Sequence, residues 1–157
     1  MTKYVIYILL VVTTFSCSKK IEIDENKVFK LNRYDNISSL DPINARTQAN
    51  NWACNLIYNS LVKIDQQLEI QPDIAKSWVI SSNGKTYSFT LKNDVYFHKH
   101  EAFGKDSTRI VTASDFVFSF DRLKDPKAGG SGGWIMNNID SYQAKNDSVF
   151  EIKLKEA

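Results

Sequence analysis

Apolar residues recur at helical spacing in two stretches of this 157-residue chain. In the first stretch they fall at positions i, i+3, i+4, i+7 and i+8, which predicts one face of an amphipathic helix that ends near Asn59. That face consists of Ala49, Trp52, Ala53, Leu56 and Ile57. We therefore expect Trp52 to pack in the core.

The second helical stretch begins with a capping-box pattern. The hydroxyl of Thr112 can accept from an unpaired backbone N–H, and the carboxylate of Asp115 can reach back to the Thr112 N–H. Asp125-Pro126 ends this helix, because the residue before a proline is driven out of the helical conformation. The apolar face between these limits consists of Ala113, Phe116, Val117, Phe120 and Leu123. We expect the two phenylalanines to pack in the core.

Alternation of apolar and polar residues over residues 85–92 predicts a half-buried strand. Its apolar face consists of Tyr87, Phe89 and Leu91. Asn83-Gly84 separates this segment from residues 78–81, and both residue types tolerate the positive φ of a type I′ turn. The sequence thus predicts an antiparallel hairpin, with Trp78 on its apolar side.

The other local patterns are shorter. Further segments with a strand pattern are residues 28–34, 61–65, 68–70 and 150–154. Pro72 suits the first turn of a short helix that runs to Ala75. Residues 129–133 read Gly-Gly-Ser-Gly-Gly, which predicts a flexible loop outside any regular element.

Composition and charge limit the class of protein. Apolar residues make up 43% of the chain and aromatic residues 12%, which is enough for the core of one ordinary globular domain. The formal net charge is only +2, and the longest basic run is Lys19-Lys20. The sequence therefore has no electrostatic footprint for nucleic acid, and we expect no nucleic-acid partner.

The N-terminus has the pattern of an export signal. Lys3 supplies a positive charge, and residues 4–15 follow as an uncharged and mostly apolar run. This run of twelve residues is shorter than the roughly 20 that a helix needs to span a bilayer. We therefore expect a cleaved leader and no permanent transmembrane anchor.

Residues 14–17, Thr-Phe-Ser-Cys, are similar to a bacterial lipobox. Cleavage before Cys17 would leave its thiol as the site of lipid attachment. The polar residues that follow then form a tether. The expected organisation is a lipoprotein signal peptide (1–16), a polar tether (17–27) and a folded body (28–157). The alternative is an ordinary secretory signal with an incidental cysteine.

Cys54 is the second cysteine of the chain. With Cys17 lipidated, one remaining cysteine cannot form a disulfide framework. Cys54 lies on the apolar side of the first predicted helix, where a free cysteine behaves as a small hydrophobe. No histidine stands in a recognisable relation to it, so a buried structural role is expected.

The residues give no catalytic constellation. A Gly-x-Ser-x-Gly elbow is absent, and the two histidines fall in one segment, so no hydrolase triad can be assembled. His98 and His100, followed by Glu101, would point the same way on a strand and are the candidate metal ligands. One such cluster without cysteine does not define a metal site. The sequence therefore predicts neither an enzyme nor a cofactor.

Four segments in a fixed order resemble the peptide/nickel-type extracellular solute-binding proteins (family 5) of ABC importers. They are residues 69–78 (EIQPDIAKSW), 83–92 (NGKTYSFTLK), 95–98 (VYFH) and 111–122 (VTASDFVFSFDR). The resemblance implies a mixed α/β (α+β) chain with a class II periplasmic-binding-protein fold. It covers only the N-terminal portion of that fold, so we expect a fragment or truncated product whose second lobe is missing.

The same resemblance implies a function. A member of this family captures di- or oligopeptides and delivers them to ABC permease and ATPase subunits. The lipid on Cys17 would hold it on a membrane of the bacterial cell envelope, facing the periplasm or the cell exterior. Within the fold, a nickel chelate, haem or an oligosaccharide are the alternative ligands. An alternative of another class is a truncated surface lipoprotein that acts only as an interaction module.

The ligand site is implied by the resemblance alone. In the family the segment after the Asp-Pro motif lies at the cleft. In this chain that segment is Asn44, Ala45, Arg46, Thr47 and Gln48. Arg46 could bind a ligand carboxylate through its planar guanidinium, and a solvated surface position is the alternative. Trp134, after the glycine-rich stretch, could contact a peptide or could pack in the core.

The histidine segment departs from the family pattern. Family members commonly have Phe-His-Asp-Gly here, so Phe97 and His98 match while Lys99 and His100 do not. The resemblance implies that His98 stabilises a loop through hydrogen bonds.

Overall fold

The computed structural model describes residues 28, 30, 32, 35–128 and 131–157. The chain divides into two compact units, Met1–Tyr34 and Asp35–Ala157, and the described fold is that of the second. The expected leader, Cys17, the tether and most of the strand expected at 28–34 lie outside the described residues. Within the described residues, no helix combines the length and the apolar character that crossing a membrane requires.

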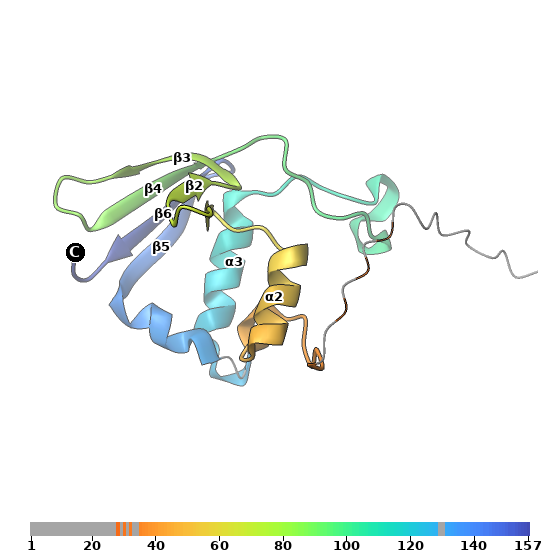
Figure 1. Cartoon of the computed structure of the whole chain (residues 1–157). Helices are drawn as coiled ribbons and strands as arrows, with labels where there is room; N and C mark the ends of the chain where they lie inside the picture. Colours follow the sequence, from red (N-terminus) through yellow and green to blue (C-terminus); the bar gives the residue numbers. More distant parts are fainter. Residues whose placement is uncertain (1–27, 29, 31, 33–34, 129–130) are drawn as a thin grey trace, which may run out of the picture. The chain divides into compact units, whose positions relative to one another are not determined.

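The centre of the Asp35–Ala157 unit is a four-stranded antiparallel sheet with the order β3-β4-β6-β5 (Figure 1). Its strands are β3 (Ala75–Ile80), β4 (Thr86–Leu91), β5 (Ile139–Asn146) and β6 (Val149–Leu154). The helix α3 (Ala113–Lys124) packs against β5 and β6. The helix thereby covers one face of the sheet, as expected for strands whose apolar and polar residues alternate.

The core lies between α3 and the sheet. Phe89 and Leu91 of β4 are buried, as their alternation predicts, and Phe150 of β6 is fully buried. The rings of Phe116 and Phe120 stand 5.6 and 5.3 Å from that of Phe150, between centroids. The expected core positions of both α3 phenylalanines are therefore confirmed.

The hairpin of β3 and β4 is confirmed, but its turn is of another type. A type I′ turn needs a positive φ at both central residues. Only Gly84, at φ 70°, has one in this loop. The Gly84 N–H donates to Ser81 O at 2.9 Å, and the Asn83 side chain accepts from the Lys85 N–H at 3.1 Å. The connection is thus a longer loop that needs one left-handed glycine. Beyond it Trp78 pairs with Phe89, at 6.5 Å between ring centroids, as expected for the apolar side.

The helix α3 begins and ends where the sequence predicts. The capping box is present, and the Thr112 N–H donates to the Asp115 carboxylate at 2.8 Å. Asp125 caps the other end, directly before Pro126. Both limits follow from local side-chain chemistry, so they can be read from the sequence.

The helix α2 (Gln48–Ile57) is also confirmed, but its expected buried face is right only for Ala49 and Ala53 and wrong for its three large residues, Trp52, Leu56 and Ile57. The buried residues are Ala49, Asn50, Ala53 and Cys54. Trp52 is 47% exposed and Leu56 is 62% exposed. The helix thus buries its small residues and leaves its large apolar residues at the surface.

Two polar contacts explain this rotation of α2. The Asn50 side chain accepts from the Ser38 N–H and donates to the Ser38 hydroxyl, both at 3.1 Å. Cys54 Sγ lies 3.6 Å from the Leu40 carbonyl oxygen, to which it donates. The segment before α2 therefore packs closely against its small residues, which larger side chains would prevent. Cys54 is buried, as expected.

A separate two-stranded ribbon joins α2 to the sheet. It consists of β1 (Val62–Ile64) and β2 (Ile70–Pro72), which confirms two strands in this region. The helix expected from Pro72 to Ala75 is wrong, because Pro72 ends β2 and Ala75 begins β3. In a two-stranded ribbon a proline at the strand end removes no hydrogen bond from a central ladder.

The turn of this ribbon holds Leu68 in the left-handed region, at φ 65°. An L-residue there costs about 1–2 kcal/mol, whereas glycine carries about 0.5–1 kcal/mol of extra chain entropy. The Leu68 side chain is 83% exposed, so its removal loses little packing. We expect Leu68→Gly to raise the free energy of unfolding by about 0.5–1 kcal/mol in urea denaturation. Gln67→Gly is the control, because Gln67 has no positive φ, and it should not raise the free energy of unfolding. A lower free energy of unfolding in the Leu68→Gly protein would show that the backbone at Leu68 is not strained.

The last part of the chain departs most from expectation. The loop expected at 129–133 is wrong for Ser131–Gly133, because the 3-10 helix η5 (Ser131–Asn138) begins there and packs against α3. Residues 129–130 lie outside the described residues. β6 is confirmed, whereas β5 has no clear apolar alternation and is not predicted. In η5 and in β5, tertiary packing overrides the local propensity of the sequence.

Candidate functional site

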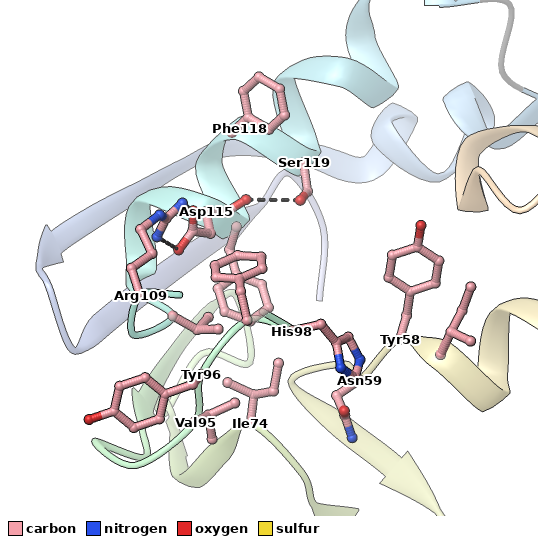
Figure 2. Close-up of a pocket in the computed structure, with 14 residues that line it drawn as sticks. Tyr58, Asn59, Ile74, Val95, Tyr96, His98, Arg109, Asp115, Phe118 and Ser119 are labelled. Atoms are coloured by element: carbon pink, nitrogen blue, oxygen red, sulfur yellow. Dashed lines mark hydrogen bonds and ion pairs between the residues drawn. The ribbon is translucent and has the colours of Figure 1, made fainter. Parts of the chain in front are cut away.

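A pocket of about 410 Å³ opens between α2, α3 and an extended segment that follows β4 (Figure 2). Its walls come from the end of α2, from the first half of α3, and from residues 95–98 and 109–111. Most of the lining side chains are apolar or aromatic. A concave, mainly apolar surface with a few polar groups is the usual form of a small-ligand site.

Backbone pairing holds the extended wall of the pocket. Tyr96 and Ile110 form an isolated antiparallel bridge. The Phe97 N–H donates to Arg109 O at 3.0 Å, and the Val111 N–H donates to Val95 O at 2.9 Å. These bonds pair two segments that are separated in sequence by the loop that contains residues 99–108.

An ion pair fastens this wall to α3. The Arg109 guanidinium donates to both carboxylate oxygens of Asp115, with Nη1 at 2.9 Å from Oδ2. The guanidinium carbon also lies 4.6 Å from the ring centroid of Phe97 and 5.8 Å from that of Phe103. Arg109 is thus held by a bidentate pair and by stacking on aromatic faces.

The pKa of Asp115 lies below its ordinary value of 3.8. Burial, the largest single influence, raises it, but the hydrogen bonds from Arg109, from the Thr112 N–H and from the Thr112 hydroxyl, together with the charge of Arg109, lower it by more. The same pair raises the pKa of Arg109. Both groups are therefore charged at neutral pH, and their charges cancel.

A depressed carboxyl pKa stabilises the fold above the unfolded value and loses that contribution as pH falls through the folded value. We expect the free energy of unfolding, from urea titrations, to decrease as pH falls below 3.8. Asp115→Asn should cost about 1–2 kcal/mol at neutral pH and flatten part of this decrease. Asp106→Asn, at an exposed position on another element, is the control. An unchanged pH profile in Asp115→Asn would contradict this account.

Other polar groups line the pocket on the side away from Arg109 in the view of Figure 2. They belong to Tyr58, Asn59 and His98. The Asn59 amide donates to the Asp73 carboxylate at 3.0 Å, which fixes its orientation. Tyr58 caps the end of α2 and is 51% exposed. This side therefore offers a hydroxyl, an imidazole and an oriented amide to a ligand.

The candidate metal ligands His98 and His100 lie in an irregular segment after β4. Neither lies on a strand, and both are exposed. His98 lines the pocket. The loop hydrogen bond expected of His98 belongs instead to His100, whose Nδ1 accepts from the Ala102 N–H at 3.1 Å at the start of η3 (Glu101–Asp106). Among the described residues, no three His, Cys, Asp or Glu side chains are grouped as a metal site.

The structure relates one end of the 44–48 segment to the element that carries Trp134. Asn44 ends the short helix η2 (Pro42–Asn44), which packs against η5, the element that carries Trp134. Trp134 is 72% exposed, so the alternative of core packing is wrong for it. An exposed indole remains available for contact with a ligand.

Within the 44–48 segment the side chains have different surroundings. Thr47 caps α2, because its hydroxyl accepts from the Asn50 N–H at 3.2 Å. Ala45 is half-buried, whereas Arg46 and Gln48 are exposed. Thr47 is therefore committed to the helix, and the exposed residues on either side of it are the better candidates for ligand contact.

An ion pair between α3 and the loop before α2 fixes the position of this segment. Arg122 donates to the Asp41 carboxylate at 2.7 Å. The hydrogen bond from Arg122 lowers the pKa of Asp41, so the pair persists at neutral pH. The Asp41-Pro42 motif thus anchors the start of η2 to α3.

Sequence reasoning missed the pocket itself. Its walls come from segments that lie up to about sixty residues apart, from Ile57 to Ser119, so no local motif marks it. One local signal was present: Phe118 is a large aromatic residue outside the predicted apolar face of α3, and it is 65% exposed. The pocket and the 44–48 segment lie at opposite ends of the ten-residue helix α2, about 15 Å apart along its axis.

Comparison with known proteins identifies the family. Residues 69–157, more than half of the chain, match the model of the bacterial extracellular solute-binding proteins, family 5 Middle. The dipeptide-binding protein DppE of Bacillus subtilis is 28% identical over 120 residues, which cover 76% of this chain and 21% of DppE. The chain thus spans about a fifth of the length of this curated relative.

Solved structures show the same relationship. The ABC transporter-associated periplasmic binding protein DppA from Helicobacter pylori, in complex with the peptide STSA, is 32% identical with a TM-score of 0.65, over 75% of this chain and 25% of DppA. NikZ from Campylobacter jejuni, in complex with Ni(L-His), is 29% identical with a TM-score of 0.61, over 76% of this chain and 22% of NikZ. These similarities confirm the expected mixed α/β fold. The chain belongs to the family 5 bacterial extracellular solute-binding proteins.

Proposed function

We propose that this protein is the solute-binding component of an ABC importer and that it captures di- or oligopeptides. The observation that carries the proposal is the family match over residues 69–157, which include the whole four-stranded sheet and α3. Support for a peptide ligand comes from DppE, which is named as a dipeptide-binding protein, and from DppA, which was solved with a bound peptide.

The described lobe would act as a rigid wall of the binding site. Its elements are fixed by the buried core and by the Arg122–Asp41 and Arg109–Asp115 pairs. Binding proteins close around a ligand by a hinge motion between lobes, and such closure requires that each lobe move as a unit. Permease and ATPase subunits would then accept the ligand and hydrolyse ATP, so this chain itself would need no catalytic residues.

We place the first ligand contacts at residues 44–48 and at Trp134. The packing of η2 against η5 supports this assignment, because η2 ends at Asn44 and η5 carries Trp134. Arg46 would donate to a ligand carboxylate, and the exposed Trp134 ring would cover apolar parts of the peptide.

The proposal includes a lipid anchor on Cys17. The leader would occupy residues 1–16 and the tether residues 17–27, and residues 28–157 would form the N-terminal part of the binding lobe. Support comes from the uncharged run at residues 4–15, which stops at a small residue directly before the cysteine. The lipid would keep the protein in the cell envelope, beside its permease.

The ligand can be identified by native mass spectrometry. The protein is isolated from the cells that produce it, without denaturation, and the mass of any bound molecule is measured before and after release in acid. We expect short peptides. NikZ, solved with Ni(L-His), gives the main competing ligand class. Release of a nickel chelate, of haem or of an oligosaccharide in place of peptides would contradict the proposal.

A further inference from the structure

We propose that the pocket between α2 and α3 binds an uncharged aromatic or aliphatic side chain of a captured oligopeptide. This inference rests on the proposed function and adds a ligand class to it. It concerns a site at the opposite end of α2 from residues 44–48. Charge, size and the nature of the pocket rim lead to it independently.

The charge of the pocket excludes ionised side chains. Among its lining residues only Arg109 and Asp115 carry formal charges at neutral pH with histidine neutral. These two groups are bonded to each other through both carboxylate oxygens, and Arg109 is further covered by Phe97. A lysine or glutamate side chain entering the pocket would lose hydration without gaining an unpaired counter-charge.

The size of the pocket fits a side chain with part of its backbone. A volume of about 410 Å³ is within the range of roughly 300–1,000 Å³ that is typical of small-ligand sites. It corresponds to on the order of a dozen water molecules. An aromatic or branched aliphatic group would displace much of this water from apolar walls, which is the favourable term for its binding.

The rim of the pocket is aromatic and exposed. Tyr96 is 60% exposed, Phe118 is 65% exposed and Tyr58 is 51% exposed. Large apolar side chains gathered at such exposure around one opening are typical of binding surfaces. Tyr58 and Asn59 also place polar groups near the opening, where the amide groups of a peptide backbone would need hydrogen-bond partners.

The test is a nuclear magnetic resonance titration of the ¹⁵N-labelled Cys17→Ser protein, which has no lipid. The probes are the N-acetyl amides of phenylalanine, leucine, lysine and glutamate. We expect the phenylalanine and leucine probes to shift the amide signals of residues 95–98 and 116–119, with dissociation constants on the order of 1 mM because the site is half-open. The lysine and glutamate probes should bind at least tenfold more weakly.

Two variants place the binding in the pocket. Ser119→Phe introduces a ring at the pocket wall and should abolish the shifts. Phe118→Ala removes part of the rim and should weaken binding at least threefold. Val79→Ala is the matched control, because Val79 is 70% exposed on β3 and does not line the pocket. Full binding by the Ser119→Phe protein would overturn the proposal.

Other outcomes separate this inference from the proposed function. Peptide binding that shifts only residues 44–48 and Trp134 would overturn the pocket assignment and leave the proposed function intact. Equal binding of charged and apolar probes would also overturn it. Shifts of the pocket's amide signals that depend on protein concentration, in the absence of any probe, would show that a second copy of the chain binds there. That result would also overturn the pocket assignment. A protein that retains a nickel chelate and no peptide would contradict the proposed function itself.

Discussion

Replacing Phe150 by alanine is expected to lower the free energy of unfolding by about 3–5 kcal/mol, the usual cost of removing a buried phenylalanine. Phe150 has no exposed surface and lies on the central strand β6, where it pairs with Phe89 of β4 and Ala144 of β5. Its ring contacts those of Phe116 and Phe120. The truncation leaves a cavity that these rings fill only in part, because they are fixed on a capped helix.

Urea denaturation followed by tryptophan fluorescence measures this change. Phe118→Ala is the matched control, since it removes the same side chain from a position on α3 that is 65% exposed. We expect a cost below about 1 kcal/mol for the control. Equal effects of the two substitutions would mean that the core does not lie between α3 and β6, and the fold described here would be wrong.

Replacing Cys17 by serine is expected to abolish the incorporation of labelled palmitate. A serine cannot form the thioether that would attach the lipid.

Cys54→Ser is the matched control for this experiment. Cys54 is the other cysteine of the chain, and its side chain is buried against the segment before α2. The control protein should incorporate palmitate at the level of the unmodified one. Undiminished labelling of the Cys17→Ser protein would refute the lipid anchor, and the leader would then be an ordinary secretory signal.

The elements that could be predicted from the sequence are those whose limits depend on nearby side chains. The helix α3 begins at a capping box and ends before a proline, and both devices act within one helical turn. The β3–β4 hairpin follows from alternating residues around a glycine that takes a positive φ. The expected type I′ turn is wrong, because the Asn-Gly pattern indicates where the chain reverses but does not determine the length of the loop.

The errors occur where distant parts of the chain decide the structure. The face that α2 buries is set by Ser38 and Leu40, which bond to Asn50 and Cys54, and helical periodicity alone favours the larger apolar residues. η5 forms at the end of a glycine-rich stretch because it packs against α3. These outcomes depend on tertiary contacts, and a local pattern contains no information about them.

The same distinction applies to the candidate site. Residues 44–48 and Trp134 could be selected only through a family resemblance, and the structure then packs η2, which ends at Asn44, against η5, which carries Trp134. The pocket was not predicted, because its walls meet only after β4 and α3 have been positioned on the sheet. The pattern of polar and apolar residues indicates which side chains face water. The shape of the pocket depends instead on the spacing of α2, α3 and the extended segment after β4.

Isothermal titration calorimetry of the protein tests the central claim most directly. The titrants are a mixture of di- and oligopeptides, haem and a nickel–histidine complex, each added separately to ligand-free protein. We expect saturable binding of peptides and no saturable heat from the other two. Saturable binding of haem or of the nickel complex, without binding of peptides, would contradict the assignment of this protein to peptide capture.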